Sequence, residues 1–312
     1  MPKLSVCFIT YNHEKFIRQA LESVLMQQCD FDFEVVIGND CSTDGTTRIV
    51  EEFAAAYPGK IRLNIFEKNV GMTANWLSTI SACKGEYIAM LEGDDYWTDV
   101  HKLQKQVVFL DGNPSYSLVA HDLGVVKEAG VTADDFLLHF TEDRSFTLED
   151  CITMPIFLQT SSFVFRRSML TPFGSWVDKR VKSIDCVVYY MLAAQGPVYY
   201  MAEKMSVYRM HVAGISHVNW RARQNSIEFD MAYILENFNR YSHGKFKGVI
   251  YDKLEYYYMR LIRNTDPGSA LYKRALRKIV FLRPAKHMDL LKGYIINNFI
   301  PAKIYNLYKR VF

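Results

Sequence analysis

Three acidic side chains lie within four positions, at Glu92, Asp94 and Asp95, directly after the apolar run Tyr87–Leu91. Such a run is typical of a buried strand. Like charges at this spacing repel one another, and burying them without a partner would be costly. Mg²⁺ and Mn²⁺ prefer carboxylate and phosphate oxygens as ligands. The acids therefore predict a site for a divalent cation and a diphosphate. The alternative is a solvated acidic turn, but the buried strand before the acids favours the first interpretation.

Strands and helices alternate around these acids. The apolar pattern predicts strands at 4–10, 34–38, 61–66 and 87–91, and helices at 13–28, 46–57 and 73–83. This alternation with short loops is typical of an α/β fold with a mostly parallel sheet flanked by helices. Ligands bind at the carboxyl ends of the strands in such sheets. We therefore expect the polar loops after residues 10, 38 and 91 to share one cleft.

The second half of the chain has a weaker pattern. It predicts helices at 101–110 and 186–194, and strands at 117–126, 160–165 and 198–208. Residues 127–150 are polar and are expected to be irregular. Beyond residue 219 the pattern is helical, with breaks near 266–268 and 283–284. We expect a C-terminal helical extension over residues 221–312.

Composition excludes several classes of protein. The 312 residues carry a net charge of only +3. They contain no GxGxxG or GxxxxGK[ST] loop, and this absence argues against a dinucleotide dehydrogenase or a P-loop enzyme. The acidic front of the chain argues against a nucleic-acid partner. Six cysteines without a CxxC pair are typical of free thiols in a reducing compartment. No signal region or spanning helix is expected, so we predict a cytoplasmic protein.

With these landmarks in place, the first 220 residues resemble family 2 glycosyltransferases, which are inverting enzymes with the Rossmann-like GT-A fold. The matching segments are Val6–Asn12, Ala20–Gln27, Asn39–Thr46, Asn69–Gly71 and Leu91–Trp97. The resemblance implies a catalytic domain at 1–220, with a nucleotide-sugar-binding half at 1–115 and an acceptor half at 116–220. The family often has aspartate where Glu92 stands, which leaves the role of Glu92 open.

The resemblance also implies residues for the donor, a nucleotide-diphospho-sugar with UDP as the expected nucleotide. The expected nucleotide-sugar-binding residues are Thr10, Tyr11, Asn12, Asp40, Asn69, Gly71, Asn75, Asp94 and Arg209. Asp40 would accept a hydrogen bond from the base. The alternative role for Asp40 is an Asx turn with a helix cap. For Asp44 we favour that structural role. Asp95 and His211 would hold Mn²⁺ or Mg²⁺. The alternative for His211 is a loop histidine with a backbone partner.

The acceptor half supplies a general base in this family, and Asp185 matches its position. The base must lie within hydrogen-bond reach of the attacking hydroxyl. The alternatives are a helix N-cap at Asp185 or a base at Asp178. The resemblance implies a glycan or lipid-linked glycan acceptor, a hexosyl or N-acetylhexosaminyl donor sugar, and a setting in bacterial cell-surface polysaccharide or lipopolysaccharide synthesis.

The C-terminal region differs in charge from the rest. From Tyr241 onward there are 15 Lys and Arg residues against 4 Asp and Glu. Basic helices of this kind suit an anionic membrane surface, which would place the protein on the cytoplasmic face of the membrane; the alternative is packing on protein, including a homo-oligomer. The competing functions are a nucleotidyltransferase, which should carry a glycine- and basic-rich loop after its first strand, and a non-catalytic nucleotide-sugar-binding or scaffold protein.

Overall fold

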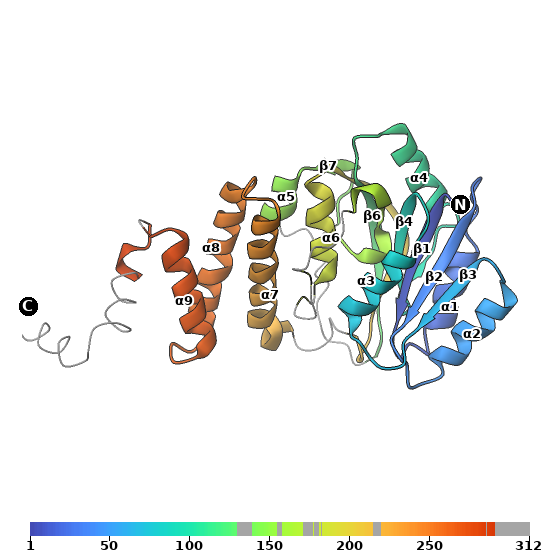
Figure 1. The fold of residues 1–312 in the computed structure, drawn as a ribbon, viewed down its shortest axis with the longest axis horizontal. Helices are drawn as coiled ribbons and strands as arrows, with labels where there is room; N and C mark the ends of the chain where they lie inside the picture. The colour runs from blue at the N-terminus through green and yellow to red at the C-terminus, as the bar shows by residue number, and fades with distance from the viewer. Residues whose placement is uncertain are drawn as a thin grey trace, which may run out of the picture. The chain divides into compact units, whose positions relative to one another are not determined.

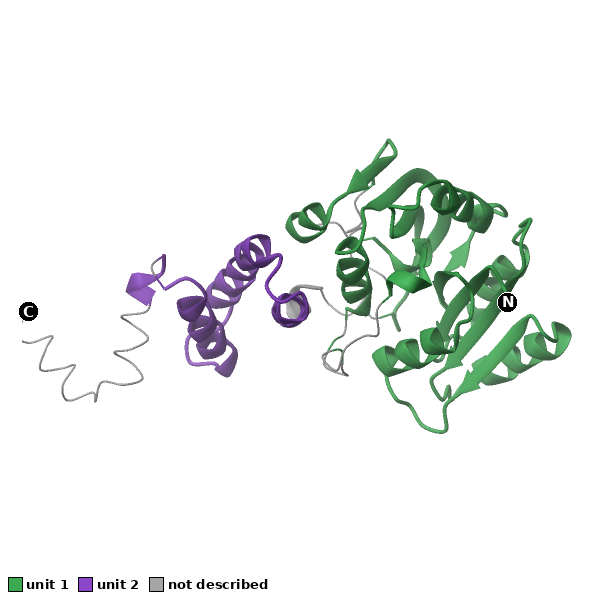
Figure 2. Cartoon of the chain, turned by 45° about the horizontal axis from the view of Figure 1, so that its top comes forward, with its two compact units in different colours: residues 1–220 green, residues 221–312 purple. Residues whose placement is uncertain are grey.

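The computed structural model describes residues 1–129, 139–154, 158–170, 177, 181, 183–214, 220–284 and 286–290, without the side chains of 220–225. The chain divides into two compact units, Met1–Trp220 and Arg221–Phe312, which are coloured separately in Figure 2. No helix within the described ranges is both long enough and apolar enough to span a bilayer.

The first unit is built on four parallel strands, in the order β3-β2-β1-β4. They are β1 (Leu4–Thr10), β2 (Phe33–Asn39), β3 (Ile61–Ile65) and β4 (Tyr87–Glu92), and they lie side by side in Figure 1. The predicted strand-helix alternation is confirmed for this part of the chain. Because all four strands run the same way, their carboxyl ends lie at one edge of the sheet.

The later strands extend this sheet beyond β4 and make it mixed. They are β5 (Tyr96–Trp97), β6 (Leu118–Lys127), β7 (Arg144–Phe146), β8 (Val164–Arg166) and β9 (Val198–Met210). β8 is antiparallel to both β4 and β6, whereas β6 and β9 are parallel. β5 and β7 each pair with β9 in antiparallel fashion. Parallel pairing therefore holds for β1 to β4 and for the long pair β6 and β9, and the antiparallel pairings of β5, β7 and β8 are only two or three residues long.

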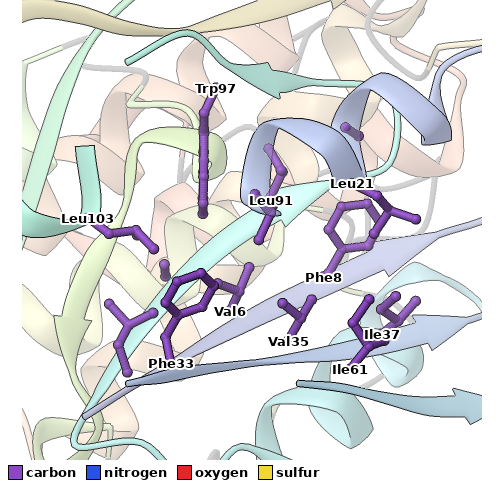
Figure 3. Close-up of a cluster of buried hydrophobic side chains, with 14 of the residues drawn as sticks. Val6, Phe8, Leu21, Phe33, Val35, Ile37, Ile61, Leu91, Trp97 and Leu103 are labelled. Carbon is purple, nitrogen blue, oxygen red and sulfur yellow. The ribbon is translucent and has the colours of Figure 1, made fainter. Parts of the chain in front are cut away.

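Helices cover both faces of the parallel strands. The helices of this half are α1 (Ile17–Leu25), α2 (Thr46–Ala56), α3 (Met72–Ala82) and α4 (Lys102–Gly112). Leu21 of α1 and Leu103 of α4 belong to the same buried cluster as Val6 and Phe8 of β1, as Figure 3 shows. α3 packs on β1 and β2 through other side chains, including Asn75, whose amide donates to the Gly38 carbonyl. Both faces of the strands are thus buried, which explains their continuous apolar runs.

Two predictions for the acceptor half were wrong in detail. Residues 160–165, predicted as one strand, form the 3₁₀ helix η1 (Thr160–Ser162) followed by the short β8. The hydroxyl-rich part turns instead of joining a ladder: Thr160 Oγ1 donates to Glu92 Oε1, and Ser162 Oγ donates to the Gln159 carbonyl. The supposedly irregular 127–150 contains β7 and the start of α5 (Leu148–Thr153). A capping box between Thr147 and Asp150 begins α5.

Five more elements complete the described part of the two units. η2 (Arg167–Met169) and α6 (Ile184–Ala193) belong to the first unit. Helices α7 (Trp220–Tyr241), α8 (Lys247–Asn264) and α9 (Ala270–Leu282) form the second, with α8 and α9 packed on each other. The predicted break near 266–268 is confirmed. The break between α7 and α8 was not predicted; there His243 and Gly244 have positive φ values of 49° and 75°.

Candidate functional site

The carboxyl ends of β1, β2 and β4 come together at one edge of the sheet. The Asp40 amide, just after β2, donates to the Thr10 carbonyl at the end of β1 (3.0 Å). The Gly93 amide, just after β4, donates to the Ile9 carbonyl (2.9 Å). The structure therefore brings together the three polar loops that the sequence predicted to share one cleft.

Asp40 holds the neighbouring loop with its side chain. One carboxylate oxygen accepts a hydrogen bond from the Val70 amide (2.6 Å) and the other accepts one from the Gly71 amide (2.9 Å). Asn69 Nδ2 donates to the Asp40 carbonyl (3.3 Å). Gly71 has φ +89°, a conformation that glycine adopts without strain. A carboxylate has about four acceptor positions, so Asp40 keeps acceptor capacity beyond these two bonds.

Tyr11 and Asn12 lie at the exposed rim of this loop cluster. Asn12 has φ +55°; its amide donates to Ser42 Oγ (3.0 Å) and its Oδ1 accepts from the Thr43 amide (2.8 Å). Thr10, in contrast, is buried. Asn75 is also buried, and its amide group is occupied by Gly38 and Thr79. The structure thus places Asn75 between α3 and the sheet, whereas Tyr11 and Asn12 face solvent.

Asp44 adopts the Asx turn that we favoured. Its Oδ1 accepts from the Thr46 amide (2.9 Å), at the start of α2. Its other oxygen accepts from the Glu14 amide (3.1 Å), which ties the loop after β2 to the segment before α1. Asp44 therefore connects the loop after β2 with the segment between β1 and α1.

Two histidines approach the same oxygen of Asp94. Asp94 Oδ2 lies 3.1 Å from His211 Nε2 and 3.7 Å from His13 Nε2. Burial alone would raise the pKa of Asp94, but His13 and His211 lower it below its ordinary value. Burial lowers the pKa of His13, although Asp94 opposes this. The lowered pKa favours the neutral form of the His13 imidazole, whose Nε2 lies near Asp94 Oδ2 without forming a hydrogen bond to it.

Gly93 is the residue that allows His13 to come so close. A Cβ atom at position 93 would lie 2.6 Å from Thr10 Oγ1, 2.8 Å from His13 Nδ1 and 2.9 Å from Ile17 Cδ1. Thr10 Oγ1 and His13 Nδ1 are themselves hydrogen-bonded (3.2 Å). Close packing therefore favours glycine at position 93, independently of the backbone conformation there.

Asp95 and Arg209 lock the acidic turn onto β9. Asp95 Oδ1 accepts from the Arg209 amide (2.9 Å), and Arg209 Nη1 donates to the Asp94 carbonyl (2.6 Å). The guanidinium also bonds Gln19 Oε1 and lies over the Tyr96 ring. Burial, followed by the charges of Asp94 and Glu92, raises the pKa of Asp95 well above its usual range. Arg209, expected to contact the donor, is therefore already engaged in holding the motif together.

Glu92 links the donor motif to the acceptor half. Its Oε1 accepts from Thr160 Oγ1 of η1 (2.5 Å), while its buried Oε2 has no hydrogen-bond partner among the described residues. Burial, together with the charges of Asp94 and Asp185, raises the pKa of Glu92 to about 7. Asp185 lies partly buried in the first turn of α6, close enough to exert this effect. Asp178, the alternative base, lies outside the described residues.

These acids suit a cation that is shared with a diphosphate. Three carboxylates gather within one turn, the pKa values of Glu92 and Asp95 are raised, and the buried Glu92 Oε2 is unsatisfied. In the part of the chain that the structure describes, however, no three His, Cys, Asp or Glu side chains form a ready metal cage. Mg²⁺-type sites use one or two carboxylates and complete their shell with phosphate oxygens and water. The donor set fits a cation of that kind.

Sequence reasoning missed several partners in this site. His13, Gln19 and the pairing of Thr160 with Glu92 were not predicted. His13 follows the first strand directly, so its position was a usable signal. The bonds of Gln19 and Thr160 depend on packing between segments far apart in the chain, and no local pattern reports them.

Comparison with known proteins identifies the family to which the chain belongs. The sequence profile described as glycosyl transferase family 2 matches residues 5–170. The chain belongs to glycosyl transferase family 2. An uncharacterized protein of Mycobacterium tuberculosis is 38% identical over 245 residues, which cover 77% of this chain and 69% of the relative.

Solved structures of glycosyltransferases share the GT-A fold of this family 2 member. TarS 1–349 of Staphylococcus aureus, crystallised with UDP-GlcNAc, aligns with a TM-score of 0.60 and 19% identity, covering 90% of this chain and 81% of TarS 1–349. The mannosyltransferase PcManGT of Pyrobaculum calidifontis, crystallised with GDP-Man and Mn²⁺, aligns with a TM-score of 0.54 and 18% identity, covering 99% and 88%. At these identities the likeness extends to the fold alone.

Proposed function

We propose that this glycosyltransferase moves a sugar from a nucleotide-diphospho-sugar, with UDP as the nucleotide, to an acceptor hydroxyl with inversion at the anomeric carbon. The observation that carries the proposal is the direct contact between the two halves, in which Thr160 Oγ1 of η1 donates to Glu92 Oε1 (2.5 Å). The acidic turn after β4 and Asp185 of α6 come close enough for Asp185 to raise the pKa of Glu92. A donor diphosphate on one side and an acceptor hydroxyl on the other would meet there.

The donor half supplies the nucleotide contacts. The nucleotide base would lie against the loops that Asp40 holds, with Thr10, Tyr11, Asn12, Asn69 and Gly71 around it. The remaining acceptor capacity of Asp40 suits the imide N–H of uracil. Asp94 would bind a hydroxyl of the ribose or the transferred sugar. Asn75 and Arg209 would act indirectly, because Asn75 supports β2 and Arg209 supports the acidic turn.

Transfer would be a single displacement. A carboxylate oxygen of Asp185 takes the proton of the acceptor hydroxyl while that oxygen attacks the anomeric carbon. The new glycosidic bond forms as the bond between the anomeric carbon and the diphosphate oxygen breaks. The electron pair of the broken bond leaves with the nucleoside diphosphate. Asp185 ends protonated and returns its proton to solvent.

A divalent cation, Mn²⁺ or Mg²⁺, would neutralise the leaving diphosphate when bound. Asp95 and His211 are the side chains we propose to hold it. Asp95 is held in place by the Arg209 amide, and His211 already contacts Asp94 Oδ2 of the same turn. His13 keeps that turn in position from the other side.

The acceptor we propose is a glycan or lipid-linked glycan of a bacterial cell-surface polysaccharide, and the transferred sugar a hexose or N-acetylhexosamine. Two relatives support this class by their names. TarS of Staphylococcus aureus is named a poly(ribitol-phosphate) beta-N-acetylglucosaminyltransferase and is 27% identical over 213 residues, 34% of its length. TuaG of Bacillus subtilis is named a putative teichuronic acid biosynthesis glycosyltransferase and is 26% identical over 234 residues, 86% of its length. Synthesis from cytoplasmic donors would place the enzyme on the cytoplasmic side of the membrane.

The decisive experiment compares nucleotide binding with donor turnover. Thermal shift with UDP, TDP, GDP, CMP and ADP, with and without Mn²⁺, identifies the nucleotide; a ligand at a hundred times its Kd adds about 2.7 kcal/mol. Asp185→Asn should bind the selected nucleotide like the wild type but lose at least about a hundredfold in transfer. The matched control is Glu149→Gln, an exposed acid in the first turn of α5. Absence of nucleotide binding in the wild type would refute the donor site, and full activity of Asp185→Asn would refute the base.

A further inference from the structure

Helix α9 has two distinct faces. Ala275, Ile279 and Val280 are buried within the second unit. The exposed side chains Lys273, Arg277 and Phe281, together with Ala270, cluster on the opposite side, because 3.6 residues make one turn. The exposed Arg274 lies at the edge of this face, where its guanidinium contacts the Phe229 ring of α7 (4.4 Å). Phe281 is 63% exposed. One face of α9 is therefore basic and aromatic, and it carries no acid.

The positive charge of this face is not balanced within the unit. Other bases near it are paired: Lys278 with Glu236 of α7, and Arg283 and Lys286 with Glu255 of α8. Lys273, Arg274 and Arg277 form no ion pair with a described residue, and residues 267–288 contain no Asp or Glu. The nearby acids are thus already engaged by other bases, which leaves the α9 face with a net charge of about +3 at neutral pH.

We propose that this face of α9, defined by Lys273, Arg274, Arg277 and Phe281, docks the enzyme onto an anionic lipid bilayer. The charges complement phospholipid headgroups, and a helix of this length presents about 20 Å of surface along a plane. Phe281 lies in line with the bases, and Met288, just after the helix, is 46% exposed. Apolar side chains among bases suit the boundary between headgroups and acyl chains, and they distinguish a bilayer from a nucleic acid.

The docking face deepens the proposed function, because it rests on an acceptor that is carried by lipid. Enzyme and acceptor would then meet on one surface. The docking proposal and the proposed transfer reaction can nevertheless be refuted independently, because vesicle binding requires neither a donor nor Asp185.

The test is co-sedimentation of the full chain with phosphatidylcholine vesicles, with and without phosphatidylglycerol. We expect binding only with phosphatidylglycerol, and release at high salt. Each base near an anionic surface contributes about fivefold, equivalent to ~1 kcal/mol, so Lys273→Glu/Arg277→Glu should bind at least about 25-fold more weakly. The matched control is Lys247→Glu/Arg263→Glu, which reverses the charge of two exposed bases of α8 and should bind nearly as wild type.

Phe281→Ala provides a second, charge-neutral variant. It should weaken vesicle binding while leaving its salt dependence unchanged, because only the apolar contact is lost. Far-UV circular dichroism of all variants checks that the helices remain. The proposal is overturned if the wild type does not bind anionic vesicles or binds neutral vesicles equally well. It is also overturned if the α8 control loses as much binding as the α9 variant.

Discussion

Gly93→Ala tests whether the acidic motif depends on close packing against the loop after β1. The added methyl would lie within 3.0 Å of Thr10, His13 and Ile17, closer than real Cβ contacts occur. Ile17 is completely buried in the core and cannot retreat freely. Overpacking of this kind costs about 1–3 kcal/mol. For a unit of this size, that lowers Tm by roughly 2–12 °C.

The methyl should also separate His13 from Asp94. His13 can relieve the contact only by breaking its bond to Thr10 Oγ1 or by moving away from Asp94 Oδ2. We therefore expect nucleotide binding with Mn²⁺ to weaken by more than the loss of stability alone would cause. The measurements are urea unfolding followed by the fluorescence of the buried Trp76 and Trp97, and calorimetric titration with UDP and Mn²⁺.

Gly112→Ala is the matched control, because a Cβ at Gly112, the last residue of α4, would meet no atom within 4 Å. It should change stability by less than about 1 kcal/mol. If Gly93→Ala unfolds at the same urea concentration as Gly112→Ala and binds UDP normally, the packing argument for the motif is refuted.

Two further predictions concern buried carboxylates. Asp40→Asn should destabilise the protein by about 2–4 kcal/mol in urea unfolding and weaken nucleotide binding, because one of the amides of Val70 and Gly71 would face an NH₂ group instead of an acceptor; wild-type stability would contradict this. Glu92 has a folded pKa of about 7, above its ordinary 4.5, so its charged form opposes folding. Stability should therefore rise as pH falls from 8 toward 5. Glu92→Gln should remove up to about 3 kcal/mol of that rise. An unchanged pH profile of urea unfolding would show that Glu92 is not the group responsible.

The sequence predicted the donor edge of the sheet well for a physical reason. Strands that are buried on both faces have continuous apolar runs, so their ends could be predicted to within one residue: at 10, 38 and 91, against Thr10, Asn39 and Glu92 in the structure. The acceptor half was predicted less well because its strands are short and its contacts are long-range. The run Phe163–Phe165 has the composition of a strand, and the predicted strand was extended back to Thr160, where the backbone instead forms a 3₁₀ turn. Such contacts are decided by packing, which a local pattern does not record.

The motif that begins at Glu92 and ends at Trp97 is joined by hydrogen bonds to η1, which belongs to the half that we propose binds the acceptor. At one end, Glu92 accepts from Thr160 Oγ1; at the other, Trp97 Nε1 donates to the Ser161 carbonyl (2.9 Å). Gln106 of α4 donates to the carbonyl of Ser162, the next residue of η1 (2.8 Å). All three residues of η1 are thus fixed by side chains from the donor half. A displacement of the acidic turn must therefore also move η1, so a substitution at the donor site is expected to alter acceptor affinity as well.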